Sequence, residues 1–135
     1  MIKKMLVLVT VFMLLLSGCS GSSGYSVTKP VGEVSNPVQL ALSYENFNGK
    51  KFGDFYPVAT GELIDFHVHV ETRSGSLTIY LTPEDDRDKI IYIAEDIPSS
   101  EFSFTIDQPG EYVLYLVGEN HKGGYSITNT RTHNS

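Results

Sequence analysis

Two histidines and two carboxylates alternate along one short stretch of the chain, at Asp65, His67, His69 and Glu71. If this stretch is a β-strand, its alternate side chains project from one face, about 7 Å apart at a rise of ~3.3 Å per residue. Imidazole and carboxylate groups are ordinary zinc ligands, so the four residues are candidate metal ligands. The same alternation is typical of the solvated face of an amphipathic strand, and the pattern favours that second interpretation.

A second group of candidate ligands is acidic. Asp85, Asp86 and Asp88 lie close together in a predicted loop, where carboxylates supply the hard oxygen ligands that calcium prefers. The loop lacks the spaced Asp-x-Asp-x-Asp-Gly order of a dedicated calcium site. The alternative is a solvated turn whose carboxylates pair locally with Arg87 and Lys89.

Aromatic rings are concentrated between residues 44 and 61, where glycine and asparagine are also frequent. This composition predicts a loop after the first strand of the domain, and rings in such a loop form a platform for sugars or peptides. The candidate ligand-binding residues are Phe47, Phe52, Phe55 and Tyr56. The alternative is that the rings fold over one end of the domain and close it, which the absence of tryptophan favours.

The sequence contains none of the motifs that mark common catalytic sites. Gly-x-Ser-x-Gly, His-Glu-x-x-His and the glycine-rich phosphate loop are all absent. We therefore expect a protein that is not an enzyme. The net charge of −6 disfavours contact with a phosphate backbone, so nucleic acid is not among the expected partners.

Cys19 is the single cysteine of the chain and follows an apolar segment. Lys3 and Lys4 precede an apolar run of 12 residues, 5–16, which is too short to span a bilayer but has the size of a signal-peptide core. Leu16-Ser17-Gly18-Cys19 resembles the lipobox of bacterial lipoproteins. The resemblance implies that the Cys19 thiol takes up a diacylglycerol group and that the signal is cleaved before Cys19. It also implies a further acyl chain on the new amino terminus in many cases, and two or more chains anchor stably.

These features divide the chain into three parts. Residues 1–18 are expected to be a removable signal peptide, and residues 19–36 a lipidated cysteine followed by a flexible linker. Residues 37–135 are expected to form the folded domain, with one hydrophobic core and no disulfide. The expected location is the extracytoplasmic face of the cell membrane, and the sequence leaves the type of envelope open.

From residue 38 onward, apolar residues recur mostly with a period of two, which predicts an all-β domain. Residues 62–71 alternate most clearly, and residues 111–117 are apolar on both faces, as in a central strand. Further strands are predicted at 38–44, 77–81, 91–93, 102–106 and 123–130. Turns are predicted at 73–76, 108–110 and 120–124, and residues 130–135 are expected to fray. The spacing favours an antiparallel, jelly-roll-like β-sandwich of seven or eight strands.

Four segments in the second half of the chain resemble strands of the bacterial pre-peptidase C-terminal type of β-sandwich. They are Gly75-Ser76-Leu77-Thr78-Ile79-Tyr80-Leu81, Phe102-Ser103-Phe104-Thr105, Pro109-Gly110-Glu111-Tyr112-Val113-Leu114-Tyr115-Leu116 and Gly124-Tyr125-Ser126-Ile127. In that family the module is an accessory to secreted enzymes, so the resemblance implies a sandwich that binds rather than catalyses. We expect no enzyme attached to this module, and we transfer no site residues from the family.

The expected function is that of a non-catalytic binding module, held on the membrane by lipid and directed at a cell-wall polymer, a peptide or a protein partner. A structural or protective lipoprotein, such as an assembly subunit or an immunity factor, is an alternative that fits the small size and the acidity equally well. A metal-binding lipoprotein is a further alternative, which rests on His67 and His69 for zinc, while calcium would rest on the acidic loop.

Overall fold

The computed structural model describes residues 24–133, which form seven β-strands. The strands are β1 (Gly24–Thr28), β2 (Val31–Ser35), β3 (Gln39–Val58), β4 (Glu62–Pro83), β5 (Tyr92–Ala94), β6 (Ser100–Ile106) and β7 (Gly110–His133). Every pairing is antiparallel, which confirms the predicted all-β class. In the described range no helix has the length and apolar character needed to cross a membrane. The predicted signal peptide and the predicted lipidation site Cys19 lie outside the described residues.

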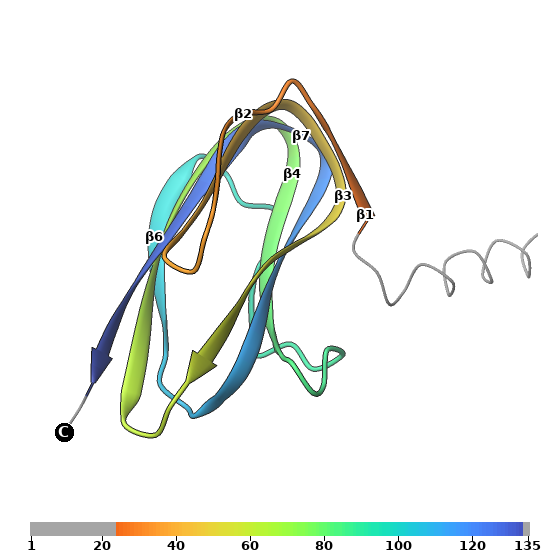
Figure 1. The fold of residues 1–135 in the computed structure, drawn as a ribbon. Coiled ribbons are helices and arrows are strands. Elements are labelled where there is room, and N and C mark those ends of the chain that lie inside the picture. Colours follow the sequence, from red (N-terminus) through yellow and green to blue (C-terminus); the bar gives the residue numbers. More distant parts are fainter. Residues whose placement is uncertain (1–23, 134–135) are drawn as a thin grey trace, which may run out of the picture.

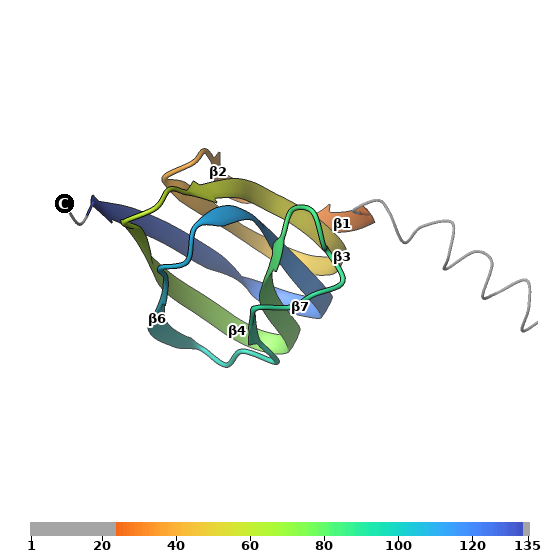
Figure 2. The same cartoon turned by 90° about the horizontal axis from the view of Figure 1, so that it is seen from below.

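A single hydrogen-bonded sheet is folded over into a two-layer sandwich, because its three longest strands, β3, β4 and β7, bend at the same end of the molecule (Figure 1). Layer 1 has the strand order β2, β3, β7, β4, β6, and layer 2 has the order β1, β3, β7, β4, β5. β7 is central in both layers, and in layer 2 this confirms the central strand predicted for residues 111–117. The β3–β4 and β6–β7 connections lie at the opposite end (Figure 2).

Glycine is required where the long strands bend side by side. Gly75 on β4 has a φ angle of +78°, and a Cβ atom added there would lie 2.0 Å from the carbonyl oxygen of Asn120. Gly123 on β7 has a φ angle of +143°, and an added Cβ atom would lie 1.9 Å from the carbonyl oxygen of Glu71. The β3–β7 and β4–β7 registers also shift at this level. Only glycine combines this backbone angle with this approach, so the two residues fix where the sheet folds over.

The core fills the space between the layers and consists of inward-facing aliphatic and aromatic side chains. Its largest fully buried apolar members are Phe47, Tyr56, Ile64, Phe66, Val68, Leu77, Ile79, Leu81, Leu114, Leu116 and Ile127. Aromatic rings of the two layers contact each other across the core. The ring centres of Tyr56 and Phe66 lie 4.9 Å apart in an edge-on arrangement, and those of Tyr92 and Phe104 lie 3.9 Å apart in a stacked one. Each such pair contributes about 0.5–1.5 kcal/mol beyond the burial of its area.

The folded domain begins earlier than the sequence predicts. β1 and β2 lie in the residues assigned to the flexible linker, yet each pairs with β3, β1 in layer 2 and β2 in layer 1. Both are edge strands in which only Val27 and Val34 are partly buried, so they lack the alternating apolar pattern that identifies a strand. The boundary at residue 37 is therefore wrong, and only residues 20–23 separate Cys19 from the sheet.

Several segments predicted as turns, loops or frayed ends are strand instead. Residues 73–76 and 120–124 are the bends of β4 and β7, and most of the aromatic segment 44–61 belongs to β3. β7 continues to His133, where the Arg131 guanidinium donates to the Pro57 carbonyl oxygen and to the Glu62 carboxylate, at 2.5 and 2.8 Å. Turn-forming residues in this chain therefore also mark positions where a paired strand bends without ending.

The two strands that precede β7 differ in how well the sequence predicts them. β6 and the turn at 108–110 lie where the pattern places them. β5 is shifted by one residue from the predicted strand, and its inward side chains are Tyr92 and Ala94. Ile91 and Ile93 are consequently 39% and 41% exposed. The apolar residues that predict this strand thus lie on its outer side, while Tyr92 and Ala94 pack against the core.

A buried hydrogen-bond chain joins the strands at the bend. His121, which the sequence places in a turn, is fully buried in β7, and its Nδ1 and Nε2 atoms lie 2.6 Å from the Tyr44 hydroxyl and 2.8 Å from the Thr72 hydroxyl. The Thr72 hydroxyl donates to the Ile97 carbonyl oxygen at 2.8 Å, so it accepts from the Nε2–H group of His121. Nδ1 then accepts from Tyr44, and every proton of the neutral imidazole network has a partner.

We expect the domain to lose stability as the pH falls below 6.5. Burial lowers the pKa of His121 below its ordinary value of 6.5, so the unfolded chain binds a proton that the folded chain does not. This stability is present above the unfolded pKa and is lost as the pH falls toward the folded pKa. Urea unfolding between pH 8 and pH 5 measures it, with pH values chosen to bracket the ordinary histidine pKa of ~6.5.

A His121→Gln variant provides the control, because it has no imidazole to titrate at the bend. The variant should be less stable than the wild type at pH 8, and the difference should shrink as the pH falls. An unchanged difference across the range would contradict the neutral network. Tyr44→Phe should lower the free energy of unfolding by about 1–3 kcal/mol, because it leaves Nδ1 of His121 buried without a hydrogen-bond donor.

Candidate functional site

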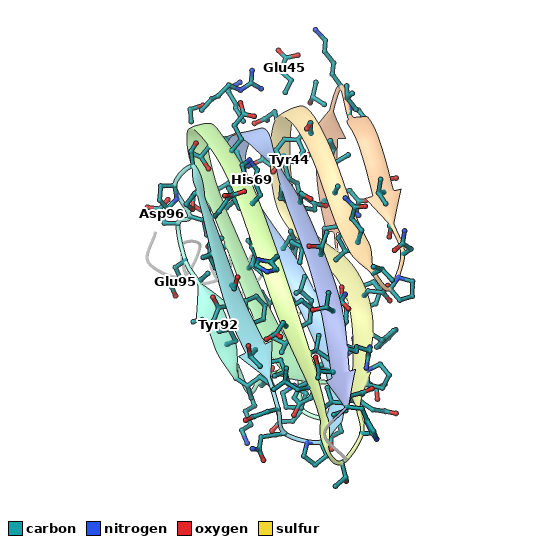
Figure 3. All side chains as sticks on the ribbon, turned by 90° about the vertical axis from the view of Figure 1, so that its left-hand side faces the viewer. Tyr44, Glu45, His69, Tyr92, Glu95 and Asp96 are labelled. Carbon is teal, nitrogen blue, oxygen red and sulfur yellow. The ribbon has the colours of Figure 1, made fainter. Side chains whose placement is uncertain are left out.

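The alternating residues of the first half of β4 lie on the outer face of layer 1, with β6 on one side and β7 on the other. Figure 3 views this layer from outside, with His69 labelled. We call this surface the histidine face and define it by six polar residues, His67, His69, Glu101, Ser103, Ser126 and Thr128. His67 lies between Ser103 and Thr128 in the strand register, and His69 lies between Glu101 and Ser126.

The imidazole rings of the histidine face are held in place from β6. Nδ1 of His67 lies 2.9 Å from the Ser103 hydroxyl, and Nδ1 of His69 lies 3.1 Å from a Glu101 carboxylate oxygen. These contacts leave Nε2 of each ring for a ligand. Because the neighbouring residues on β7 are the small Ser126 and Thr128, the face is hollowed, with a volume of about 550 Å³. The result is an open depression lined by oriented donors and acceptors.

The other two predicted zinc ligands are not directed at a shared ion with the histidines. The Asp65 carboxylate accepts from the Thr105 hydroxyl at 2.5 Å, one row along the sheet. Glu71 borders a second shallow hollow beside His69. Within residues 24–133, no group of three or more histidine, cysteine, aspartate or glutamate side chains is arranged to hold a metal ion. A metal at this face would therefore depend on the two imidazoles, and the zinc hypothesis stays a prediction.

The outer face of layer 2 carries a cluster of apolar residues. We call it the aromatic face and define it by Phe52, Phe55, Tyr80, Ile93 and Tyr115, which come from four adjacent strands. The Tyr80 and Tyr115 rings stack at 5.2 Å, and Phe52 meets both Phe55 and Tyr115, at 4.9 and 6.2 Å. Phe55 and Ile93 are 46% and 41% exposed, Phe52 and Tyr80 are half-buried, and Tyr115 is only 4% exposed, so it forms the floor of the cluster. Exposed apolar side chains grouped on the outer face of a sheet mark a surface of contact.

Two cations belong to the aromatic face. The Lys50 ammonium lies 4.3 Å from the centre of the Tyr115 ring and 5.5 Å from that of Tyr80. The Arg87 guanidinium donates to the Tyr115 hydroxyl at 3.1 Å, and none of the ion pairs of the described residues joins it to the aspartates beside it. Tyr80 and Tyr115 are not among the site residues predicted from the sequence, whereas Lys50 and Lys51 stand out there as charges able to face anionic lipid or wall polymer. The sequence does contain a signal for Tyr80. In the predicted strand Thr78-Ile79-Tyr80-Leu81 the residue between the two inward apolar residues is aromatic, which indicates an apolar outer face.

The structure separates the four aromatic residues predicted as one ligand-binding group. Phe47 and Tyr56 point into the core and are 0% and 2% exposed, so they are not available as a surface platform. Phe52 and Phe55 lie on the aromatic face, where Phe55 is 46% exposed. All four are on β3 and not in a loop, so the prediction of a loop platform is wrong.

The predicted calcium ligands lie at the end of the sandwich opposite the bend. Asp85 lines an open pocket of about 690 Å³ between the β4–β5 and β6–β7 connections, together with Glu84, Asp107, Glu111 and other residues. Backbone bonds shape the loop, since the Asp86 amide donates to the Pro83 carbonyl and the Lys89 amide to the Asp86 carbonyl. Among the described ion pairs none involves Arg87 or Lys89, so the predicted local pairing is wrong.

No protein-family model matches the chain, and no curated protein matches it. Its fold is similar to that of a protein of Bacillus endospore appendages, which are disulfide-linked pili, with a TM-score of 0.52, 14% identity, and coverage of 85% of this chain and 93% of that chain. A pre-peptidase C-terminal domain of collagenase from Bacillus anthracis has a TM-score of 0.46, 18% identity, and coverage of 81% and 88%. A carbohydrate-binding module of Cellvibrio mixtus lichenase 5A, in complex with cellotriose, has a TM-score of 0.42, 14% identity, and coverage of 82% and 88%.

The similarity to the pilus protein supports the sandwich fold, and at this identity it supports nothing finer. A pre-peptidase C-terminal domain, which the sequence resembles, is among the similar structures. The site must therefore be argued from this chain's own residues. Two opposite faces qualify, one polar and hollowed on layer 1 and one apolar and cationic on layer 2.

The zinc hypothesis for His67 and His69 is tested by thermal melts of the chain with excess zinc and with a chelator. Two imidazoles oriented through Nδ1 form a weak zinc site. If that site binds, zinc at 100 times its dissociation constant should raise the free energy of unfolding by about 2.7 kcal/mol. That corresponds to a midpoint rise of roughly 10 °C in a domain of this size. The His67→Ala/His69→Ala variant should show no rise. A rise of equal size in that variant would place the ion elsewhere.

Proposed function

We propose that this chain is a lipid-anchored, extracytoplasmic binding module whose histidine face holds a hydroxyl-rich polymer of the cell envelope. Cys19 carries the lipid, and the sandwich carries the binding surface. No reaction is assigned to the chain, because its sequence contains no common catalytic motif and its histidines face an open, solvated hollow.

The observation that carries the proposal is the hollow on layer 1. His67, His69, Ser103, Ser126 and Thr128 present imidazole and hydroxyl groups, which both donate and accept hydrogen bonds. Sugars offer the same mixture of donors and acceptors along a chain. The face lies on three paired strands, so a bound chain would meet a rigid surface with few side chains left to order.

The position of the hollow fits a wall polymer better than a small molecule. It is open along the sheet and continues into a second shallow hollow that shares His69 and Glu101 and reaches Ser99 and Glu71. Small-molecule sites enclose most of their ligand, whereas an open depression along several strands accommodates an extended chain. We therefore assign the ligand class as an extended, polyhydroxylated polymer.

The His67→Ala/His69→Ala variant should bind purified peptidoglycan with its attached wall polymers about tenfold more weakly than the wild type. The loss of two hydrogen bonds of roughly 1 kcal/mol each is enough for such a change. Cosedimentation of the protein with the insoluble wall material measures the affinity.

Phe55→Ser is the matched control for wall binding, because Phe55 is on the opposite face and half exposed. It should bind as the wild type does. If Phe55→Ser loses binding while the histidine variant keeps it, the ligand belongs to the aromatic face and the proposed site is wrong.

The anchor has a separate test. In a bacterium that processes lipoproteins, the wild-type chain should incorporate labelled fatty acid and float with membranes, whereas Cys19→Ser should do neither, because only a thiol forms the thioether. Ser23→Ala, beyond the motif, should behave as the wild type. A wild-type chain without label would contradict the proposed anchor, without bearing on the histidine face.

A further inference from the structure

The aromatic face has the composition of a surface that contacts an interface. Of the large apolar side chains exposed in the described residues, Phe55, Ile90, Ile91 and Ile93 lie on layer 2 or in the loop beside it. Phe55 is linked to Tyr80 through ring contacts of Phe52 and Tyr115, and Tyr80 pairs with Ile93. Tyr115 is only 4% exposed, so it lies beneath the patch, whose exposed members are Phe55 and Ile93 with Phe52 and Tyr80 half-buried. Apolar patches with a polar rim mark protein or membrane contacts, and tyrosine suits the headgroup level because its ring is apolar and its hydroxyl polar.

The charges around this face suit lipid headgroups. Lys50 and Arg87 contact the rings of the face, and neither takes part in an ion pair of the described residues. Long cationic side chains of this kind lie along apolar surface and place their charge at the phosphate level. Residues 84–88 add four carboxylates at one end of the patch, so apolar contact and not net charge must supply the attraction.

The position of the anchor brings this face toward the membrane. Residues 20–23 alone separate Cys19 from β1, so Gly24 lies within about 17 Å of the lipidated residue even if the segment is fully extended, at ~3.4 Å per residue. Gly24 pairs with Lys50, at the edge of layer 2. β1 pairs with residues 46–50 in the middle of β3, and the two strands are neighbours in Figure 1 as well. The layer that carries the aromatic face is therefore the layer tied to the lipid.

We propose that the aromatic face docks on the headgroup region of the membrane that holds Cys19, so that the histidine face on the other layer is turned outward. This inference rests on the proposed lipid anchor. A short tether keeps the face at high effective concentration near the bilayer, so contacts too weak to recruit a free protein are enough to orient an anchored one.

The experiment uses the chain from residue 19 onward, which contains the whole described domain, coupled through its single thiol to a maleimide lipid in phosphatidylcholine vesicles. The chain has no tryptophan, so Phe55→Trp introduces a unique reporter on the aromatic face. Ser103→Trp on the histidine face is the matched control. Acyl chains carrying bromine quench only a tryptophan that reaches the lipid.

We expect the emission of Phe55→Trp to shift to shorter wavelength and to be quenched, while Ser103→Trp is not quenched. A Gly/Ser insertion of about 20 residues before Gly24 should reduce the effective concentration of the face roughly tenfold, and the quenching should fall with it. Because the coupling is chemical, the result does not depend on whether cells lipidate Cys19, so the two proposals fail separately.

Three results would overturn the docking proposal. The first is equal emission and no quenching for both reporters, which would leave the aromatic face in water. The second is equal quenching of both, which would mean that the domain has no preferred orientation. The third is a shift of Phe55→Trp emission with protein concentration in the absence of vesicles, which would make the face an interface between two copies of the chain.

Discussion

The whole molecule depends on three neighbouring strands bending together at one level. Each long strand serves both layers, so a bend that is out of step in one strand would break its pairing with the next. Glycine at the closest backbone approaches lets the bent strands pass each other without a steric clash. His121 gives the buried polar groups at the bend their partners. One chain of hydrogen bonds joins it to Tyr44 of β3 and Thr72 of β4, and Thr72 bonds to the Ile97 carbonyl before β6. Removing a partner from such a chain leaves buried polar atoms unpaired, so the arrangement is kept as a unit.

Strand register also determines which side chains lie on each outer face. A regular strand would place Phe52 and Phe55 on opposite faces, since they are three residues apart. A register shift between Phe52 and Asp54 inserts an extra residue, so Phe52 pairs with Tyr115 and Phe55 with Val113 on the same outer face. Gly53 lies at this bulge, and an added Cβ atom there would lie 2.9 Å from Leu114. One irregularity in β3 therefore creates the aromatic face.

The sequence predicts a strand correctly where one face is buried and the other is exposed to solvent. The prediction is wrong where the two faces do not differ in this way. The alternation of β4 through Ile64, Phe66 and Val68 places His67 and His69 on the outer face, as the structure does. Turn residues such as Gly75 carry a signal for a reversal, but partner strands decide whether the chain reverses or bends. β1 and β2 are polar edge strands without any period, and they become strands because β3 offers an unpaired edge. Tertiary pairing, which no local pattern contains, supplies what is missing.

A sandwich with different outer faces is useful only if something fixes its orientation. A long flexible linker would let either face meet the wall or the membrane, whereas an anchor close to β1 favours one arrangement. The aromatic face would then satisfy its apolar side chains against lipid, and the polar hollow around His67 and His69 would face the wall. In this arrangement the two edge strands that the sequence hides have a mechanical role. If Cys19 carries the proposed lipid, β1 and β2 shorten the tether, and the anchor would then orient the domain as well as retain it.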